Sequence, residues 1–284
     1  MKKIFFFISV LVLSAIGCAD QSKNNNESVS TVPELKEGDV MSGINLTVAE
    51  GKRLIAKGIA NHPQVKERMK KGTIVITTGS TNTYVAEELI NLTDPRGSFV
   101  IGYVTPKGKG SVNAGMDLTP DIVIIDGKRV DMKYEEALKK ATPEDIVFKG
   151  GNMLNYEKKQ AAVCIGSENG GPAGLVRETY AHLIIPIGLE KETFGDLYAY
   201  EKLLENKPPR SSAPRVWVHP EKSEIFTEIE AIKVMADVNI IPFASGGLAG
   251  REGGISLAVY GSKEEVQKAL DFVATVQGEA PFVE

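Results

Sequence analysis

The sequence predicts an α/β fold in which a mostly parallel sheet has helices on both faces, followed by a small α+β domain. Two observations support this prediction. Between residues 45 and 190, short runs that are apolar throughout alternate with runs of helical spacing, and after residue 190 the pattern changes. Strands without polar alternation are typical of parallel sheets that are buried on both faces. The 284 residues, 42% of them hydrophobic, suffice for one large and one small core.

Residues 1–17 predict a signal peptide for export. They combine a basic start, an apolar stretch and small residues before a cysteine. The ending "SAIGC" resembles the lipobox of bacterial lipoproteins, although Ala15 stands where that motif usually has leucine. The resemblance implies cleavage before Cys18, attachment of diacylglycerol and palmitate there, and anchoring in a bilayer of the cell envelope, outside the cytoplasm. An uncleaved anchor is the alternative, but about 15 apolar residues are short for a bilayer span.

Residues 18–44 predict a flexible tether, because the segment "ADQSKNNNESVSTVP" carries almost no apolar bulk. With Cys18 lipidated, Cys164 has no partner for a disulfide, and its apolar run "AAVCI" predicts a small buried side chain. The formal charge of −4 argues against nucleic acid as a partner. No histidine spacing indicates a metal site and no motif indicates a cofactor, while self-association stays open.

From Leu46 the chain predicts alternating helices and strands. The spacing over 46–71 indicates two short helices that are interrupted near Pro63. Next come a strand over "TIVITT", a helix over "STNTYVAEELI" that Ser80 or Thr81 would cap, and a strand over "SFVIGYV".

The second half of the large domain continues this alternation. A strand at 122–125 ends in the Asp126-Gly127 turn, a sequence that favours an antiparallel pair. The remaining patterns predict, in order, a helix, two strands, a helix and a strand at 133–141, 145–151, 161–167, 171–181 and 182–188.

Residues 191–214 predict a linker that ends in the proline- and serine-rich run "KPPRSSAP". Residues 215–284 then predict a strand, a helix capped by Ser223, two strands and a helix capped by Ser262. The order β-α-β-β-α resembles a ferredoxin-like half-sandwich, in which the helices lie on one face of a small sheet.

The stretch "TTGSTN", residues 77–82, joins a predicted strand to a predicted helix. A turn of small hydroxyl residues and one glycine at this place points backbone N–H groups and the positive helix end at one spot. The residues Thr78 to Asn82 therefore predict a cradle for an anion.

The run "GTIVITTGSTNTYVAEEL" resembles the superfamily of ribose-5-phosphate isomerases, glucosamine-6-phosphate deaminases and CoA transferases, whose first strand ends in a GTGST-like turn. In the isomerases a DG turn and a KGG turn follow, as Asp126-Gly127 and Lys149-Gly150-Gly151 do here. The resemblance implies a Rossmann-like domain over residues 45–190.

In an isomerase of this kind a carboxylate moves a proton beside a carbonyl and a lysine steadies the enediolate and the phosphate. The resemblance assigns these roles to Asp126 and Lys149. Two departures weaken the match: the second acid of the DG motif is displaced to Asp131, and about twenty residues separate DG from KGG, more than in the family. The alternative makes Asp126 a turn residue and Lys149 a charge at the end of a strand.

The tetrapeptide "SENG", Ser167 to Gly170, resembles the segment around the nucleophilic glutamate of class I CoA transferases. That resemblance implies that Glu168 attacks an acyl-CoA and forms a glutamyl thioester. The tetrapeptide lies 88 residues after Gly79, further than in the transferases. A second glycine-rich loop, in which Ser167 and Asn169 bind a ligand or cap a helix, is the alternative that we favour.

The sequence therefore predicts a lipid-anchored protein that binds a small anionic or sugar-phosphate-like ligand. A surface lipoprotein that has kept the fold without the chemistry, and a CoA or acyl transferase dependent on Glu168, are the alternatives. The catalytic candidates are Asp126, Lys149 and Glu168. The binding candidates are Thr78, Gly79, Ser80, Thr81, Asn82, Gly150, Gly151, Asn152, Ser167, Asn169 and Gly170.

Overall fold

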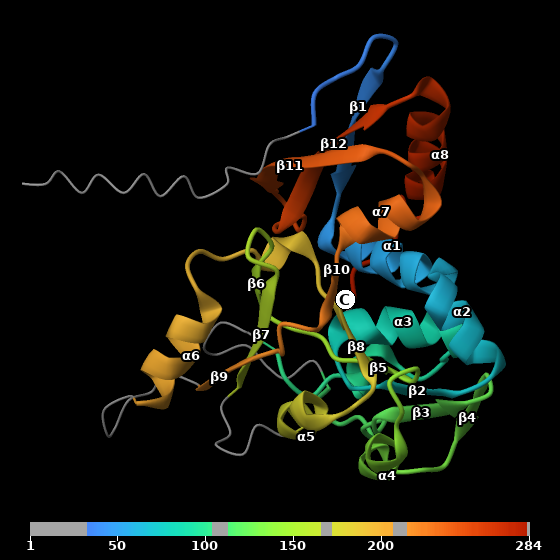
Figure 1. Cartoon of the computed structure of the whole chain (residues 1–284), viewed down its shortest axis with the longest axis vertical. Coiled ribbons are helices and arrows are strands. Elements are labelled where there is room, and N and C mark those ends of the chain that lie inside the picture. Colours follow the sequence, from blue (N-terminus) through green and yellow to red (C-terminus); the bar gives the residue numbers. More distant parts are fainter. Residues whose placement is uncertain (1–32, 104–112, 166–171, 207–214, 283–284) are drawn as a thin grey trace, which may run out of the picture. The chain divides into compact units, whose positions relative to one another are not determined.

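A six-stranded sheet lies at the centre of the computed structural model, which describes residues 33–103, 113–165, 172–206 and 215–282 (Figure 1). Its first four strands are parallel and its last two pair in antiparallel fashion. In spatial order the strands are β10 (Glu224–Phe226), β8 (His182–Pro186), β5 (Ile146–Phe148), β2 (Thr73–Ile76), β3 (Ile122–Ile125) and β4 (Lys128–Val130). The predicted mixed α/β architecture with a mostly parallel sheet is confirmed.

Helices lie on both sides of this sheet (Figure 1). The central strand β2 shows why, because Ile74, Val75 and Ile76 are all buried and both of its faces need apolar cover. The described residues contain eight α-helices, of which six flank the large sheet: α1 (Val48–Asn61), α2 (Pro63–Lys70), α3 (Ser80–Ile90), α4 (Tyr134–Lys140), α5 (Pro172–Glu178) and α7 (Glu228–Met235).

Two smaller antiparallel sheets complete the fold. One has the order β1 (Val40–Leu46), β12 (Gly254–Gly261) and β11 (Asn239–Gly246), and α8 (Lys263–Ala274) packs on it. The other has the order β6 (Met153–Asn155), β7 (Gln160–Ile165) and β9 (Arg215–Val218), with α6 (Leu197–Glu205) beside it. Two short 3-10 helices, η1 (Arg96–Phe99) and η2 (Leu189–Lys191), lie in connections.

The strands of residues 215–284 do not form a sheet of their own. β9 pairs with β7, β10 is an edge strand of the six-stranded sheet, and β11 and β12 form a sheet with β1. β1 begins at Val40, within the predicted tether, and α6 lies within the predicted linker. Alternation of apolar residues predicts that a segment is a strand, but it does not say which distant strand it pairs with.

Several local predictions are confirmed. His62 separates α1 from α2, which begins at Pro63. Asp126 and Gly127 take φ values of 49° and 77° in the turn that joins the antiparallel strands β3 and β4. Ser262 caps α8 by accepting a hydrogen bond from the N–H of Glu265.

Other local predictions are wrong. The segment 98–104 is not a strand: η1 covers its first two residues and no ladder follows in the described part. Ser223 does not cap a helix, because residues 224–226 form β10 and Thr227 caps α7 instead. The cap of α3 is Gly79, and no side chain accepts a hydrogen bond at that helix start.

The structure tests only part of the predictions for the anchor and the cysteines. Cys18 and the signal peptide lie outside the described residues. Cys164 is half-buried rather than fully buried, and burial raises the pKa of its thiol. Among the helices that the structure describes, none has the length and apolar character needed to cross a bilayer.

Candidate functional site

A cavity of about 550 Å³ opens where β2 and β5 end. The segment after β2 is the TTGSTN turn and the segment after β5 is the KGGN turn, so parallel pairing of the two strands brings both predicted loops to one place. Side chains and backbone of four further segments line the rest of the cavity. The lining residues are Lys52, Thr78–Asn82, Gly102, Tyr103, Lys149–Met153, Val163 and Glu190–Thr193.

The TTGSTN turn presents free backbone donors. Gly79 N–H donates to the carbonyl of Phe99, but no described residue accepts a hydrogen bond from the N–H of Ser80, Thr81 or Asn82. These are the first N–H groups of α3, which have no partner within the helix and carry its positive end. A Cβ built on Gly79 would find its nearest neighbour 3.9 Å away, so a larger residue fits the fold there while it narrows the cavity.

Asn82 holds the two loops together. Its Nδ2 donates to the carbonyl oxygens of Thr77 at 2.8 Å and of Phe148 at 3.2 Å. Since carbonyls only accept, the amide orientation is fixed by its chemistry. Its Oδ1 is buried and receives no hydrogen bond from any described residue. An unpartnered buried acceptor costs about 1–3 kcal/mol, which makes this atom stand out in the cavity wall.

Lys149 follows β5 and faces the cavity without an ion-pair partner among the described residues. Burial lowers the pKa of Lys149, and the charge of Asp121 offsets part of that shift. The carboxylate of Asp121 accepts a hydrogen bond from the N–H of Thr78 at 2.6 Å, and burial raises its pKa. A cation that is drawn out of water and left unpaired favours an anion as its ligand.

No sequence motif indicated Asp121, whereas the DG turn indicated Asp126. Because β3 runs antiparallel to β2, the start of β3 lies at the cavity and its end lies at the opposite edge of the sheet. Asp126 therefore sits beside the start of β2, where it accepts a hydrogen bond from the N–H of Gly72 at 2.8 Å. It does not line the cavity with Lys149, and its geometry is that of a turn residue.

His219 supports the KGGN turn from behind. The ring is buried, and its Nε2 lies 3.2 Å from the carbonyl oxygen of Gly150, while Nδ1 has no partner among the described residues. Burial, and then the charge of Lys149, lower the pKa of His219 to about 3. The imidazole is therefore neutral at physiological pH, and Nε2 is the nitrogen that donates to Gly150.

The KGGN turn is also fixed by close packing. A Cβ on Gly151 would lie 3.0 Å from the carbonyl oxygen of Ala162, so only glycine lets the turn approach β7 so closely. The side chain of Asn152 accepts from the N–H of Cys164 at 2.6 Å and donates to its carbonyl at 3.2 Å. Asn152 thus anchors the turn to β7. The segment holds the turn in place and also contributes polar groups to the cavity.

The cavity lining also includes charged residues that no motif indicated. Lys52 comes from α1, while Glu190, Lys191 and Glu192 come from η2 and the residue after it. Lys191 pairs with Glu190 at 3.3 Å. These residues stand far from the loops in sequence, so only the packing of α1 and η2 around the sheet brings them to the site.

The predicted SENG tetrapeptide cannot be placed at this cavity. Glu168, Ser167, Asn169 and Gly170 lie outside the described residues, so the structure neither adds them to the site nor removes them. The described residues contain no group of His, Cys, Asp and Glu side chains that could hold a metal ion.

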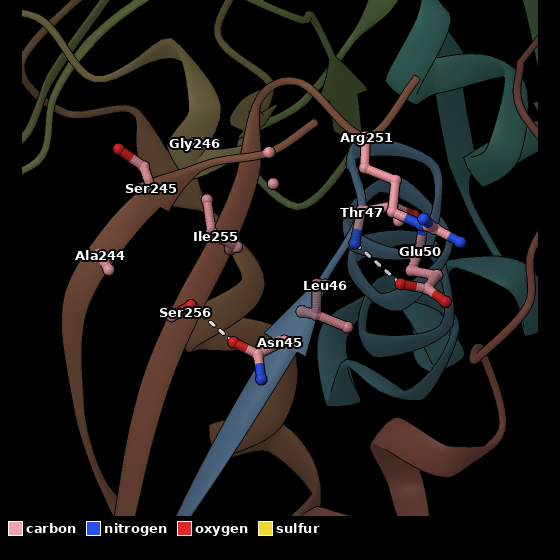
Figure 2. A pocket seen from close by; sticks show the side chains of 12 residues that line it. Asn45, Leu46, Thr47, Glu50, Ala244, Ser245, Gly246, Arg251, Ile255 and Ser256 are labelled. Atoms are coloured by element: carbon pink, nitrogen blue, oxygen red, sulfur yellow. Dashed lines mark hydrogen bonds between the residues drawn. The ribbon is translucent and has the colours of Figure 1, made fainter. Parts of the chain in front are cut away.

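A second cavity of about 450 Å³ lies at the end of the small sheet, between β1, the start of α1 and the β11–β12 loop (Figure 2). Arg251 and Glu50 lie side by side there, and Ser256 donates to Asn45 at 2.6 Å. The carboxylate of Glu50 already accepts from the N–H groups of Thr47 and Gly278. Its polar groups are exposed or satisfied, so this hollow is a weaker candidate than the cavity at β2 and β5.

Comparisons of this chain with protein-family models, with curated proteins and with solved structures found no match. The function therefore has to be argued from the geometry of the site.

Proposed function

We propose that this chain is a lipid-anchored bacterial envelope protein whose cavity at the ends of β2 and β5 binds a small anionic, sugar-like molecule. One observation carries the proposal: Lys149 and the N–H groups of Ser80, Thr81 and Asn82, all without a partner among the described residues, line the same cavity. Helix N-termini and unpaired lysines are both favourable places for phosphate and carboxylate groups. The volume of about 550 Å³ accommodates a molecule of the size of a sugar phosphate.

The polar character of the other lining groups supports a ligand with hydroxyls in addition to its charge. Thr78, Ser80 and Thr193 contribute hydroxyl groups, and Glu190 and Glu192 contribute carboxylates that accept from ligand hydroxyls. Glu190 also pairs with Lys191, and Glu192 also accepts from the N–H of Tyr156. The resemblance of the GTIVITTGST run to the ribose-5-phosphate isomerase, deaminase and CoA transferase superfamily points in the same direction, and a Rossmann-like large domain belongs to this proposal.

The anchor is part of the proposal and rests on the sequence. Sugar phosphates and CoA esters are metabolites of the cytoplasm, whereas the basic start, apolar stretch and SAIGC ending favour export and lipidation at Cys18. We therefore give binding precedence over catalysis. Asp126 accepts a hydrogen bond from the N–H of Gly72 and does not line the cavity, so the residue to which the resemblance assigns proton transfer supports no isomerase step there.

Isothermal titration of the full-length protein in detergent tests the binding proposal. The ligands are inorganic phosphate, a pentose phosphate, the same free sugar and a CoA ester. Lys149→Met should weaken the binding of the anion about 10- to 150-fold, because a hydrogen bond to a charged group is worth about 1.5–3 kcal/mol. Lys158→Met is the matched control, since Lys158 is half-exposed and outside the cavity.

Each outcome of this titration has a meaning. Binding of the pentose phosphate that Lys149→Met and Gly79→Val both abolish supports the proposal. Binding of the CoA ester alone favours the transferase alternative, and no binding of any ligand favours the non-catalytic surface protein. Equal losses in Lys149→Met and Lys158→Met would contradict a site at this cavity.

Metabolic labelling tests the anchor separately. Cells that express the chain in the presence of labelled palmitate should incorporate it into the wild type, and Cys18→Ser should accumulate as an unlabelled precursor. Equal labelling of both would contradict lipidation at Cys18.

A further inference from the structure

Lys52 lines the same cavity as the anion cradle, and the proposed function does not use it. The residue is half-buried on α1, and it lines both this cavity and a neighbouring one at the start of α1. No carboxylate of the described residues lies within ion-pair distance of its Nζ, and the closest aromatic ring, that of Phe282, has its centroid 5.5 Å away. Among the described residues the amine therefore has no ion-pair partner, and its side chain lines two cavities that a ligand could enter.

The carboxylates around Lys52 are engaged elsewhere. Glu190 is paired with Lys191 at 3.3 Å. Glu228, at the start of α7, is buried, and its Oε2 accepts a hydrogen bond from the N–H of Leu189 at 3.0 Å. Burial, and then the charge of Glu190, raise the pKa of Glu228. The charges of Glu190 and Glu228 offset part of the effect of burial on Lys52, but neither carboxyl forms an ion pair with it.

Gly51 makes this arrangement possible. A Cβ at residue 51 would lie 2.5 Å from Oε1 of Glu228, so the glycine before Lys52 leaves the space that the buried carboxyl occupies. The close approach of α1 and α7 at this point brings Glu228 next to the residue before Lys52.

Burial, and then the nearby charge of Lys191, lower the pKa of Lys52 to about 8. At pH 7.5 roughly a quarter of such a side chain is free amine, against roughly 0.1% for a lysine with an ordinary pKa of about 10.4. Desolvated lysines with free amine are the nucleophiles that form imines with carbonyl compounds.

We propose that Lys52 is a nucleophilic lysine that forms an imine with an aldehyde or ketone group of a ligand held in this cavity. The amine nitrogen attacks the carbonyl carbon, the carbon–nitrogen double bond replaces the carbon–oxygen double bond, and the oxygen leaves as water with both amine protons. No oxidant, reductant or cofactor is required. The inference rests on the proposed function for the position of the ligand, since the cradle would hold its anionic end in the same cavity.

The ligand class follows from this placement. It is a small molecule with a phosphate or carboxylate at one end and a carbonyl at the other, such as an open-chain sugar phosphate or an oxo acid. The cradle and Lys52 would then bind its two ends, and the hydroxyl and carboxylate groups between them would bind its hydroxyls.

Reductive trapping tests the inference. Full-length protein in detergent is incubated at pH 7.5 with glycolaldehyde phosphate and cyanoborohydride, and tryptic peptides are analysed by mass spectrometry. We expect the reduced adduct on Lys52 at least tenfold faster than on Lys57, which lies on the same helix and faces Glu88 at 3.9 Å. Lys52→Arg should remove that adduct, and Lys57→Arg should leave its rate unchanged.

Uncharged glycolaldehyde separates this inference from the proposed function. Rapid labelling of Lys52 by both aldehydes, with inorganic phosphate slowing only the phosphorylated one, supports both. If phosphate neither binds nor protects but glycolaldehyde still labels Lys52 selectively, the anion cradle fails and the reactive amine stands. If phosphate binds but the adduct appears on Lys149 or spreads evenly over surface lysines, the inference is overturned and the cradle stands.

The pH dependence of labelling gives a second measurement that does not depend on the fold of a variant. The rate at Lys52 should rise with pH and level off above about pH 8. The charged and titratable groups that face Lys52 or line the neighbouring cavity are Glu190, Lys191, Glu228, Glu50, Arg251, Glu252 and Glu279. A rate at Lys52 that keeps rising over pH 7–10 would contradict the inference.

Discussion

The six-stranded sheet has two edges across its strands, one where the parallel strands begin and one where they end. The polar side chains at these two edges are paired differently. At the edge where β8 and β10 begin, Glu224 lies between His182, at 3.0 Å from its Nε2, and His62, at 3.4 Å. At the edge where β2 and β5 end, Lys149 has no ion pair and Oδ1 of Asn82 has no donor among the described residues. Satisfied groups hold elements together, whereas unsatisfied groups around a cavity leave a place for a ligand.

The difference shows in the pKa values. The two imidazoles outweigh the effect of burial at Glu224 and lower its pKa to about 2, so the fold stabilises that charge. At the other edge burial dominates, lowering the pKa of Lys149 and lowering that of His219 to about 3, so the fold disfavours those charges. Mutations at the first edge should therefore change stability, and mutations at the second edge should change ligand binding.

The largest expected effect is the acid sensitivity caused by His219. Its pKa is lowered in the folded chain, so the unfolded chain binds the extra proton and stability falls as pH drops from 6.5 towards 3. Between pH 6.5 and 4 this group should remove about 3 kcal/mol from the free energy of unfolding. His219→Gln keeps a donor for Gly150 and should flatten that dependence in urea unfolding.

The control for this experiment is a variant at the other edge of the sheet. His62→Gln changes a histidine that already faces a carboxylate, so it should not flatten the acid dependence in the same way. If His219→Gln loses stability with falling pH as steeply as wild type, the buried neutral imidazole does not cause the acid sensitivity.

Glu224→Gln should have the next largest effect. It keeps the shape of the side chain but replaces two charge-assisted hydrogen bonds by neutral ones, which should cost about 2 kcal/mol at pH 7. Because the pKa of Glu224 is lowered when folded, this loss should be fully present above about pH 4.5 and fade as pH falls towards 2. Affinity for any ligand of the cavity should stay within twofold of wild type, and a large change in affinity would mean that the two edges are coupled.

The sequence predicts much of the sheet's centre and little of its periphery. Runs such as "TIVI" and "HLIIP" are apolar after their first residue, which identifies buried strands without knowledge of their neighbours. β1, β9 and β10 are short or half-exposed, and each pairs with a strand that is distant along the chain. Their pairing depends on non-local packing, which periodicity does not contain.

The site divides in the same way. The TTGSTN and KGGN turns are local signals, because each is a polar segment directly after a buried strand. Asp121 required the direction of β3, and Lys52 required the packing of α1 against the sheet, so neither could be derived from a motif. Asp126 shows the opposite error, since a turn that is well marked in sequence lies at the wrong edge for the proposed chemistry.

Lys149→Met should separate binding from stability. Since the fold disfavours the charge of Lys149, its removal should leave the free energy of unfolding unchanged or raise it by up to about 1 kcal/mol, while anion affinity is lost. Urea unfolding beside the titration measures both quantities, and Lys158→Met should change stability by less than about 0.5 kcal/mol. A destabilisation of Lys149→Met by several kcal/mol would place Lys149 with the structural groups.

The smallest expected effect decides whether the TTGSTN turn is a helix cap or a cradle. Ser80 makes no capping hydrogen bond at the start of α3, whereas Ser262 accepts one from Glu265 N–H at the start of α8. Ser262→Ala should therefore cost about 1 kcal/mol of stability, and Ser80→Ala less than about 0.5 kcal/mol. For ligand affinity the order should reverse. Ser80→Ala should weaken anion binding about tenfold, because the lost hydrogen bond is worth about 1.5 kcal/mol, and Ser262→Ala should leave anion binding unchanged. If Ser80→Ala destabilises the chain as much as Ser262→Ala and binds the anion as well as wild type, the turn serves the helix rather than a ligand.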